Sequence, residues 1–294
     1  ANSLEQEVAK MTPSLPFVMN VLNLQRRPDR WAKFVQSVNI PTDIMFTQYP
    51  AIDGKKMVST PQLQRIFDGN DYNMRVGMVG CAMSHIRTYI ELINSGAKCL
   101  CIFEDDIEFV PDFKEKLLSV YKQLDEYPEW DILYLGHHLF PKYRTKEVYD
   151  KQKMPTIERW SRKESLTKSM GGANGYLISS TGALKLLQYI NRVGMTNCID
   201  TMQQKTADDL TVLYASPHLI FCECFVGNNP DLDSDIQFDH GSLTMHIDQR
   251  IQEEMALYNN VETELSYEAV EAVAGNADAD QVVFYSSDNP LSLA

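Results

Sequence analysis

Apolar runs and stretches of helical periodicity alternate along this chain. A run of four to eight apolar residues between polar breaks is typical of a buried strand. Apolar residues at a spacing of 3.6 are typical of a helix that packs on a sheet. The alternation predicts an α/β fold. The expected strands are 17–24, 46–51, 99–103, 131–135, 175–179, 210–215 and 219–225, and the expected helices are 28–38, 77–95, 111–126, 182–192 and 197–204.

The apolar run at 99–103 ends in three adjacent acids, Glu104, Asp105 and Asp106. Neighbouring carboxylates repel one another, so they need a cation or strong hydrogen-bond donors close by. Carboxylate oxygens suit Mg²⁺ or Mn²⁺, and open α/β sheets bind ligands at the carboxyl ends of their strands. This stretch favours a metal–diphosphate site, and a solvated acidic turn is the alternative.

Three arginines, Arg26, Arg27 and Arg30, surround the start of the helix that follows the first strand. Cations are unfavourable at that end because the helix dipole is already positive there. The arrangement is favourable if an anion binds between the arginines. The alternative is that they pair with acids at the surface.

The 294-residue chain is 44% hydrophobic, which is enough for one large α/β domain or two small ones. The formal charge is −13, and residues 247–294 hold ten acids and one arginine. The large basic footprint of a duplex nucleic-acid-binding protein is absent. We expect a polar leader at 1–16, a catalytic domain at 17–246, and an acidic extension at 247–294 that is partly disordered or depends on a partner.

No apolar run is long enough to span a bilayer, so a soluble protein is expected. The six cysteines include no Cys-x₂-Cys pair of the zinc-ribbon type. Cys99 and Cys101 lie on one face of an expected strand, as do Cys222 and Cys224. This pattern favours buried free thiols and a reducing compartment such as the cytoplasm. Residues 141–168 are polar and basic without periodicity, which predicts a long loop.

Five motifs, in order, resemble glycosyltransferase family 25, which includes lipooligosaccharide and procollagen galactosyltransferases. The first is Asn23-Leu24-Gln25-Arg26-Arg27-Pro28-Asp29-Arg30, similar to N-L-x-R-R-x-x-R. The segment from Gly77 to His85 is similar to the helix start G-x-x-G-C-x-x-S-H, and Phe103-Glu104-Asp105-Asp106 is similar to the acidic motif. Residues 130–136 match W-D-I-L-Y-L-G, and residues 176–187 match Y-x-I-S-x-x-G-A-x-K-L-L. The resemblance covers about residues 18–225.

The resemblance implies a GT-A-type, Rossmann-like nucleotide-sugar-binding domain with a mixed, mainly parallel sheet. It implies transfer of a hexose, galactose or glucose, from a UDP-sugar to a hydroxyl of a glycan or a hydroxylysine-containing acceptor. Mn²⁺ or Mg²⁺ is the expected cofactor, because the departing diphosphate must be neutralised. Two alternatives are a non-catalytic scaffold that binds nucleotide sugars and another metal–phosphate enzyme, such as a nucleotidyltransferase or a phosphohydrolase. The oligomeric state is left open.

The resemblance also suggests site residues. Glu104 and Asp106 are expected to hold the metal, and His240 either completes the metal shell or is simply exposed. Ser84 and His85 are expected at a helix N-terminus, which favours phosphate or sugar hydroxyls. The full set of donor-binding candidates is Asn23, Leu24, Arg27, Arg30, Asp53, Ser84, His85, Glu104 and Asp105.

Asp200 is the candidate general base. Inverting transfer requires a group that takes the proton of the attacking hydroxyl. Asp200 is a single acid in an uncharged stretch, near an expected helix start in the later half of the chain. The alternative role is an acid that stabilises the positive end of that helix.

Overall fold

The computed structural model describes residues 14–71, 75–139, 141–168 and 170–222. A seven-stranded sheet runs through the middle, in the order β2-β1-β3-β7-β5-β8-β6. Its strands are β1 (Val18–Asn23), β2 (Thr47–Pro50), β3 (Cys99–Glu104), β5 (Ile132–Tyr134), β6 (Thr156–Arg159), β7 (Gly175–Ser179) and β8 (Val212–Ser216). A separate antiparallel pair consists of β4 (Ile107–Phe109) and β9 (Ile220–Cys222).

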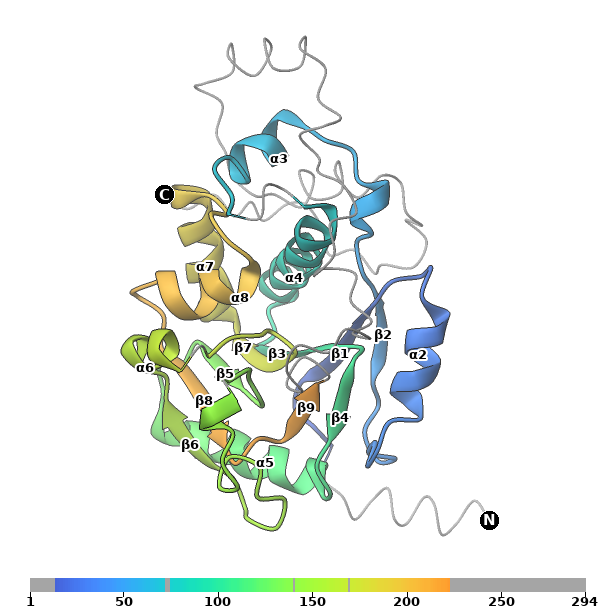
Figure 1. The fold of residues 1–294 in the computed structure, drawn as a ribbon, viewed down its shortest axis with the longest axis vertical. Helices are drawn as coiled ribbons and strands as arrows, with labels where there is room; N and C mark the ends of the chain where they lie inside the picture. The colour runs from blue at the N-terminus through green and yellow to red at the C-terminus, as the bar shows by residue number, and fades with distance from the viewer. Residues whose placement is uncertain (1–13, 72–74, 140, 169, 223–294) are drawn as a thin grey trace.

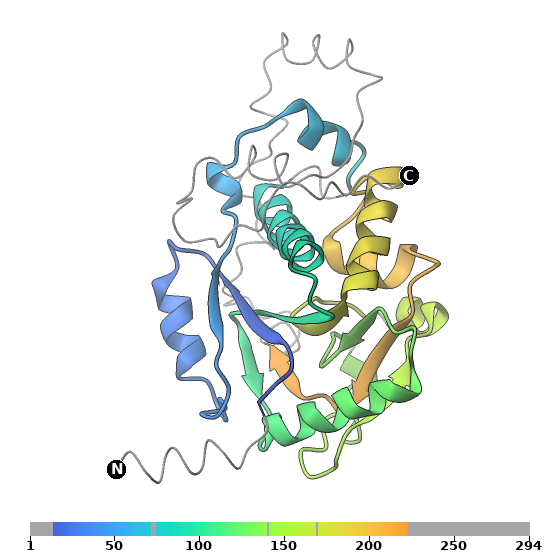
Figure 2. The same ribbon diagram turned by 180° about the vertical axis from the view of Figure 1, so that it is seen from behind.

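The helices lie between the strands in sequence and on both faces of the sheet in space (Figures 1 and 2). The α-helices are α2 (Pro28–Val35), α3 (Pro61–Ile66), α4 (Val76–Ser95), α5 (Phe113–Gln123), α6 (Arg162–Thr167), α7 (Ser180–Val193) and α8 (Ile199–Thr201). Short 3₁₀ segments are η1 (Gly54–Lys56), η2 (Leu124–Glu126) and η3 (Pro141–Tyr143), and a π-helical segment, η4 (Met202–Thr206), follows α8.

Two hydrophobic cores hold the three layers together. Alternating side chains of β3 enter different cores, because successive residues of a strand point to opposite faces. Leu100 and Ile102 pack with α4 and α7, whereas Cys101 and Phe103 pack with α2 and α5. Cys99 lies in the same core as Cys101, and the five cysteines among the described residues are free thiols, as the spacing predicts.

The direction of the strands confirms the expected fold class. β1, β2 and β3 are parallel, and β5 is parallel to β8. β7 is antiparallel to both of its neighbours, β3 and β5, and β6 is antiparallel to β8. Five of the seven strands therefore run in one direction. This is a mixed, mainly parallel sheet of the Rossmann-like, GT-A type.

Several expected boundaries need correction. The helix expected at 28–38 ends at Val35. The helix expected at 182–192 begins at Ser180, and its N-cap is Ser179, whose hydroxyl accepts from the backbone N–H of Gly182. The polar segment 141–168 is not a plain loop, since it contains β6 and α6.

Helix α4 begins at Val76 and ends at Ser95, and its C-cap, Gly96, has a left-handed backbone (φ 71°). Ser84 and His85 therefore lie in the middle of a 20-residue helix rather than at its N-terminus. In the parts of the chain that the structure describes, no helix combines the length and apolar character needed to cross a membrane.

Candidate active site

The carboxyl ends of β1 and β3 lie side by side and form the base of the candidate site. Leu22 is in register with Glu104, so the next residues, Asn23 and Asp105, meet just beyond the pairing. Asn23 Nδ2 donates to Asp105 Oδ2 at 2.7 Å. Parallel pairing of these two strands thus places the acid triplet at the edge of the sheet where ligands bind in open α/β folds.

Arg30 is the cation that faces the acid triplet. It stands in the first turn of α2, where its guanidinium contacts Asp105 Oδ1 through Nε at 2.8 Å and through Nη2 at 2.6 Å. Nη2 also lies 3.6 Å from Asp106 Oδ2. Arg30 and Asp105 are 14% and 7% exposed, so little solvent screens this charge. Arg30 explains how neighbouring carboxylates are tolerated here.

Asp106 has a different environment from Asp105. Its Oδ1 is buried and has no hydrogen-bond partner among the described residues. Burial, followed by the negative charge of Glu104, raises the pKa of Asp106 to about 7. A carboxyl with one unpaired buried oxygen and a raised pKa can accept a cation, since a cation would both pair that oxygen and favour the charged form.

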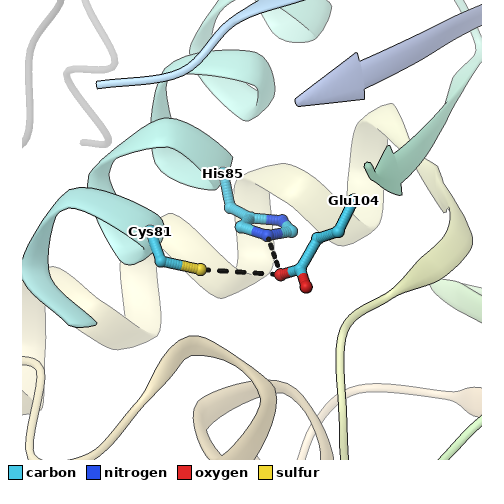
Figure 3. A group of neighbouring side chains, drawn as sticks. All are labelled: Cys81, His85 and Glu104. Carbon is cyan, nitrogen blue, oxygen red and sulfur yellow. Dashed lines mark hydrogen bonds and ion pairs between the residues drawn. The ribbon is translucent and has the colours of Figure 1, made fainter. Parts of the chain in front are cut away.

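Glu104 accepts hydrogen bonds from three side chains, of which Figure 3 shows His85 and Cys81. Asn174 Nδ2 donates to Oε2 at 3.1 Å. On the other oxygen, Oε1, the His85 Nε2 atom lies at 3.4 Å and the Cys81 Sγ atom at 3.6 Å. Cys81 and His85 are four residues apart on α4 and therefore share one face of that helix. The structure thus brings His85 to the acid triplet, although from the middle of the helix.

Ser84 faces away from this cluster. Its buried hydroxyl donates to the Gly80 carbonyl at 2.7 Å and accepts from the Ile52 backbone N–H at 2.8 Å. Both partners are backbone groups. The hydrogen bond from Ile52 joins α4 to the segment that follows β2. The close approach requires glycine at position 80, because a Cβ there would lie 2.8 Å from the Ile52 carbonyl oxygen.

Asp200 lies at the same end of the sheet and is linked to Glu104 through the loop 171–174. Its Oδ2 accepts from the Gly172 N–H at 2.8 Å, and its Oδ1 accepts from the Thr201 N–H at 2.9 Å and from the Cys198 thiol. Gly172 has φ +87°, a conformation that favours glycine. The same loop places Asn174 within hydrogen-bond distance of Glu104.

The remaining sequence candidates lie around this centre. Arg26 pairs with Asp53 at 2.9 Å, and Asp53 also caps η1 by accepting from the Lys55 N–H. Arg27 pairs with Asp29 at 2.8 Å. The Leu24 carbonyl accepts from the Arg27 N–H, which closes the turn between β1 and α2. His240 and the boundary at 246 lie outside the described residues.

Two residues of the cluster, Cys81 and Asn174, were not expected from the sequence as part of the site. A signal for Cys81 existed in its spacing from His85, because residues four apart on a helix lie on one face. A signal for Asn174 existed in its position directly before the buried strand β7. Neither signal indicates proximity to Glu104 unless the pairing of β3 with β7 is known.

Comparisons with known proteins agree with the motifs. A family model described as "Glycosyltransferase family 25 (LPS biosynthesis protein)" matches residues 17–203. A "Glycosyltransferase 25 family member" of Drosophila melanogaster is 30% identical over 192 residues, which cover 63% of this chain and 29% of the relative. "Procollagen galactosyltransferase 2" of Homo sapiens is 27% identical over 178 residues, 57% of this chain and 26% of the relative.

A third relative, "Probable inactive glycosyltransferase 25 family member 3" of Bos taurus, is 30% identical over 127 residues, 40% of this chain and 21% of the relative. The chain matches less than a third of the length of each of these three proteins. The matched family region contains every described candidate residue of the site, from Asn23 to Asp200.

Proposed function

The chain belongs to glycosyltransferase family 25, and from that membership we propose that it transfers a hexose from a UDP-sugar to a hydroxyl group. Galactose or glucose is the sugar, and a saccharide or a hydroxylysine residue is the acceptor. The name of the human relative, a procollagen galactosyltransferase, supports galactose and hydroxylysine. The observation that carries the proposal is the acid triplet at the carboxyl end of β3, beside the end of β1.

Mn²⁺ or Mg²⁺ is the proposed cofactor, with Glu104 and Asp106 as its ligands. The unpaired, buried Oδ1 of Asp106 fits a hard cation. Asp105 does not serve as a ligand in this proposal, because Asn23 and Arg30 hold both of its oxygens. The cation supplies positive charge for the diphosphate as it leaves the sugar. His240 remains a proposed further ligand.

Arg30 is the side chain that is proposed to bind the diphosphate, in addition to the metal ion. Its guanidinium is held by Asp105 in a fixed position with little exposure to solvent. A charge that is oriented before the reaction stabilises developing negative charge without reorganisation. Asp105, which Asn23 holds, orients Arg30. Asn23 and Asp105 are also proposed to contact the nucleoside. Leu24, Arg27 and Asp53 are proposed to line the path by which the nucleoside enters.

Asp200 is the proposed general base. Its carboxylate contacts Gly172, in the same loop as the Asn174 that contacts Glu104. A carboxylate within hydrogen-bond reach of the acceptor hydroxyl can take its proton as the bond to the sugar forms. The attacking hydroxyl would then enter between Asp200 and the sugar, on the face opposite to the diphosphate, and the transfer would invert the anomeric configuration.

The test is UDP release from a panel of UDP-sugars, with and without Mn²⁺, by the wild type and by Asp106→Asn. We expect Mn²⁺-dependent release by the wild type and a loss of about 100-fold or more in the variant, since even outer partners of metal ligands contribute 10–100-fold. The fold should survive, because burial raises the pKa of Asp106 and so favours its neutral form, which an amide matches in shape. Glu108→Gln, which alters an exposed acid of β4, is the control.

One second function has specific support. A mammalian relative carries the name of a probable inactive family member, so a nucleotide-sugar-binding scaffold is the competing candidate. If calorimetry shows that the protein binds UDP-sugars, and no combination of sugar donor and acceptor leads to UDP release, the scaffold is favoured. UDP release that is unaffected in Asp106→Asn would contradict the proposed metal site and favour another phosphate chemistry.

A further inference from the structure

Cys81, His85 and Glu104 bring three different kinds of metal ligand to one point. Figure 3 shows the Cys81 thiol and the His85 ring, both from α4, directed at Oε1 of Glu104 at the end of β3. The three ligand atoms lie within 4.8 Å of one another. Glu104 is 20% exposed, which gives this point a side open to solvent. The proposed transfer reaction uses only Glu104 of the three.

We propose that these three residues bind a thiophilic divalent cation, with Zn²⁺ as the reference ion, at a site separate from the hard-cation position at Asp106. A thiolate ligand selects Zn²⁺ or Co²⁺ over Mn²⁺ or Mg²⁺, which prefer oxygen. Three protein ligands leave a fourth tetrahedral position for water.

Two of the three distances between ligand atoms match those of a tetrahedral zinc site. Zinc–ligand bonds of about 2.0–2.3 Å at tetrahedral angles place neighbouring ligand atoms about 3.3–3.8 Å apart. In the structure His85 Nε2 lies 3.4 Å from Glu104 Oε1, and Cys81 Sγ lies 3.6 Å from the same oxygen. Cys81 Sγ and His85 Nε2, which stand four residues apart on one face of α4, lie within 4.8 Å of each other.

Outer hydrogen bonds hold two of the ligands in place. Tyr176 OH lies 2.6 Å from His85 Nδ1, the nitrogen opposite to the proposed ligand atom. Asn174 Nδ2 donates to Glu104 Oε2 and leaves Oε1 for the cation. Partners of this kind fix the orientation of metal-binding imidazoles and carboxylates.

A buried chain of hydrogen bonds continues from Tyr176. Gln203 Nε2 donates to Tyr89 OH at 2.6 Å, and the Tyr89 and Tyr176 hydroxyls pair with each other. At the far end of the chain, Tyr134 OH donates to Gln203 Oε1. Each hydroxyl can donate or accept, so Tyr176 can take either role toward His85 Nδ1.

A cation bound at Nε2 requires the proton of the neutral ring to be on Nδ1, from which it donates to Tyr176 OH. The Tyr176 and Tyr89 hydroxyls can rotate to accommodate this donor. The thiol proton of Cys81 leaves to solvent. Both ring nitrogens of His85 thus report occupancy of the site.

Because Glu104 belongs to both sites, Zn²⁺ would compete with the cation held by Glu104 and Asp106. This consequence rests on the proposed function, but binding of Zn²⁺ does not. The experiment is therefore a binding measurement on the full chain, with no sugar donor present.

The test adds Co²⁺, a spectroscopic substitute for Zn²⁺, to the wild type, Cys81→Ser, Cys198→Ser and Asp106→Asn. We expect a thiolate-to-cobalt charge-transfer band in the wild type at one equivalent, which one equivalent of Zn²⁺ removes. The band should disappear in Cys81→Ser and persist in the other two variants. Cys198 is the matched control, because its thiol is also partly buried and outside any disulfide, and it contacts Asp200.

A second measurement follows the imidazole nitrogens of His85 by ¹⁵N NMR. With Zn²⁺ bound, Nδ1 should carry the proton and Nε2 should show the shift of a metal-bound nitrogen, and Tyr176→Phe should weaken Zn²⁺ binding about 10–100-fold. The proposal is overturned by a wild type without the charge-transfer band, by a band that persists in Cys81→Ser, or by a His85 Nε2 signal that Zn²⁺ leaves unchanged. Loss of the band in Asp106→Asn would also overturn it, since the cation would then belong to the acid triplet.

Discussion

At the scale of single residues, three neighbouring acids have three different environments. Asp105 is held by Asn23 and Arg30, Glu104 accepts hydrogen bonds from neutral donors, and Asp106 keeps one oxygen unpaired. Different surroundings give identical chemical groups different roles. Asp105 therefore orients Arg30, whereas Asp106 has free capacity for a cation.

Asp200→Asn tests the proposed base. Loss of a general base lowers kcat by about 10²- to 10⁴-fold, and the Kd for the UDP-sugar should stay nearly unchanged. Rapid-mix turnover and calorimetry measure the two quantities. An equal loss in donor affinity and in kcat/KM would place Asp200 in the donor site instead.

Asp200 also accepts from the Gly172 N–H and so holds the loop 171–174 in place. The control must therefore distinguish loss of the general base from displacement of this loop. Gln204 holds the same residue by donating to the Gly172 carbonyl at 2.8 Å. Gln204→Met therefore disturbs the loop without removing a carboxylate. If both variants lose the same activity, Asp200 acts only by positioning the loop.

At the scale of elements, the packing of α4 against the segment after β2 positions Cys81 and His85. Gly80→Ala places a Cβ 2.7 Å from the Gly54 nitrogen and 2.8 Å from the Ile52 oxygen. Alanine in an open helix position normally stabilises by up to about 1 kcal/mol. Here we expect a loss of about 1–3 kcal/mol from overpacking, measured by urea unfolding. A stabilised variant would contradict the close approach.

The apolar pattern predicted the central strands well, because β1, β3, β5 and β7 are buried on both faces. The same pattern missed β6 and α6. In β6 only Ile157 is buried, and in α6 only Ser165, so neither element has an apolar face to detect. The helix start expected at 77 lies one residue from Val76, but Ser84 and His85 stand more than two turns further along α4, beyond the first turn where the helix dipole acts.

The site was predictable only in part. The acid triplet and Arg30 are close because β1 and β3 are parallel neighbours, and the sequence indicated a ligand site at that edge. Asn174 and Cys81 reach Glu104 through the antiparallel β7 and through the packing of α4. Sequence patterns do not specify which strands pair across 70 residues, so these contacts were not foreseen.

At the scale of the whole molecule, buried histidines make stability depend on pH. Burial lowers the pKa of His218 to about 3 and that of His137 well below its ordinary value. Their rings are 4.3 Å apart. Between pH 6.5 and about 3 the unfolded chain binds a proton at His218 that the folded protein does not, so stability falls as the pH falls through this window.

His218→Phe isolates this contribution. The titration of carboxylates is common to both proteins, so their difference reports the histidine. Relative to the variant, the wild type should lose about 2 kcal/mol more of its unfolding free energy between pH 7 and pH 5. Urea unfolding at both pH values measures this. Equal losses would mean that His218 takes up a proton in the folded state.

The placement of β7 between β3 and β5 also has a consequence for the order in which the chain is made. β2, β1 and β3 can pair once residue 104 has been synthesised, but the second edge of β3 waits for residues 175–179. At about 5–20 residues per second, that edge stays open for about 4–14 s. It is apolar and unpaired during this time, which is the condition that recruits other strands. A nascent chain of this fold therefore passes through an interval in which the open edge of β3 can pair with another strand before β7 covers it.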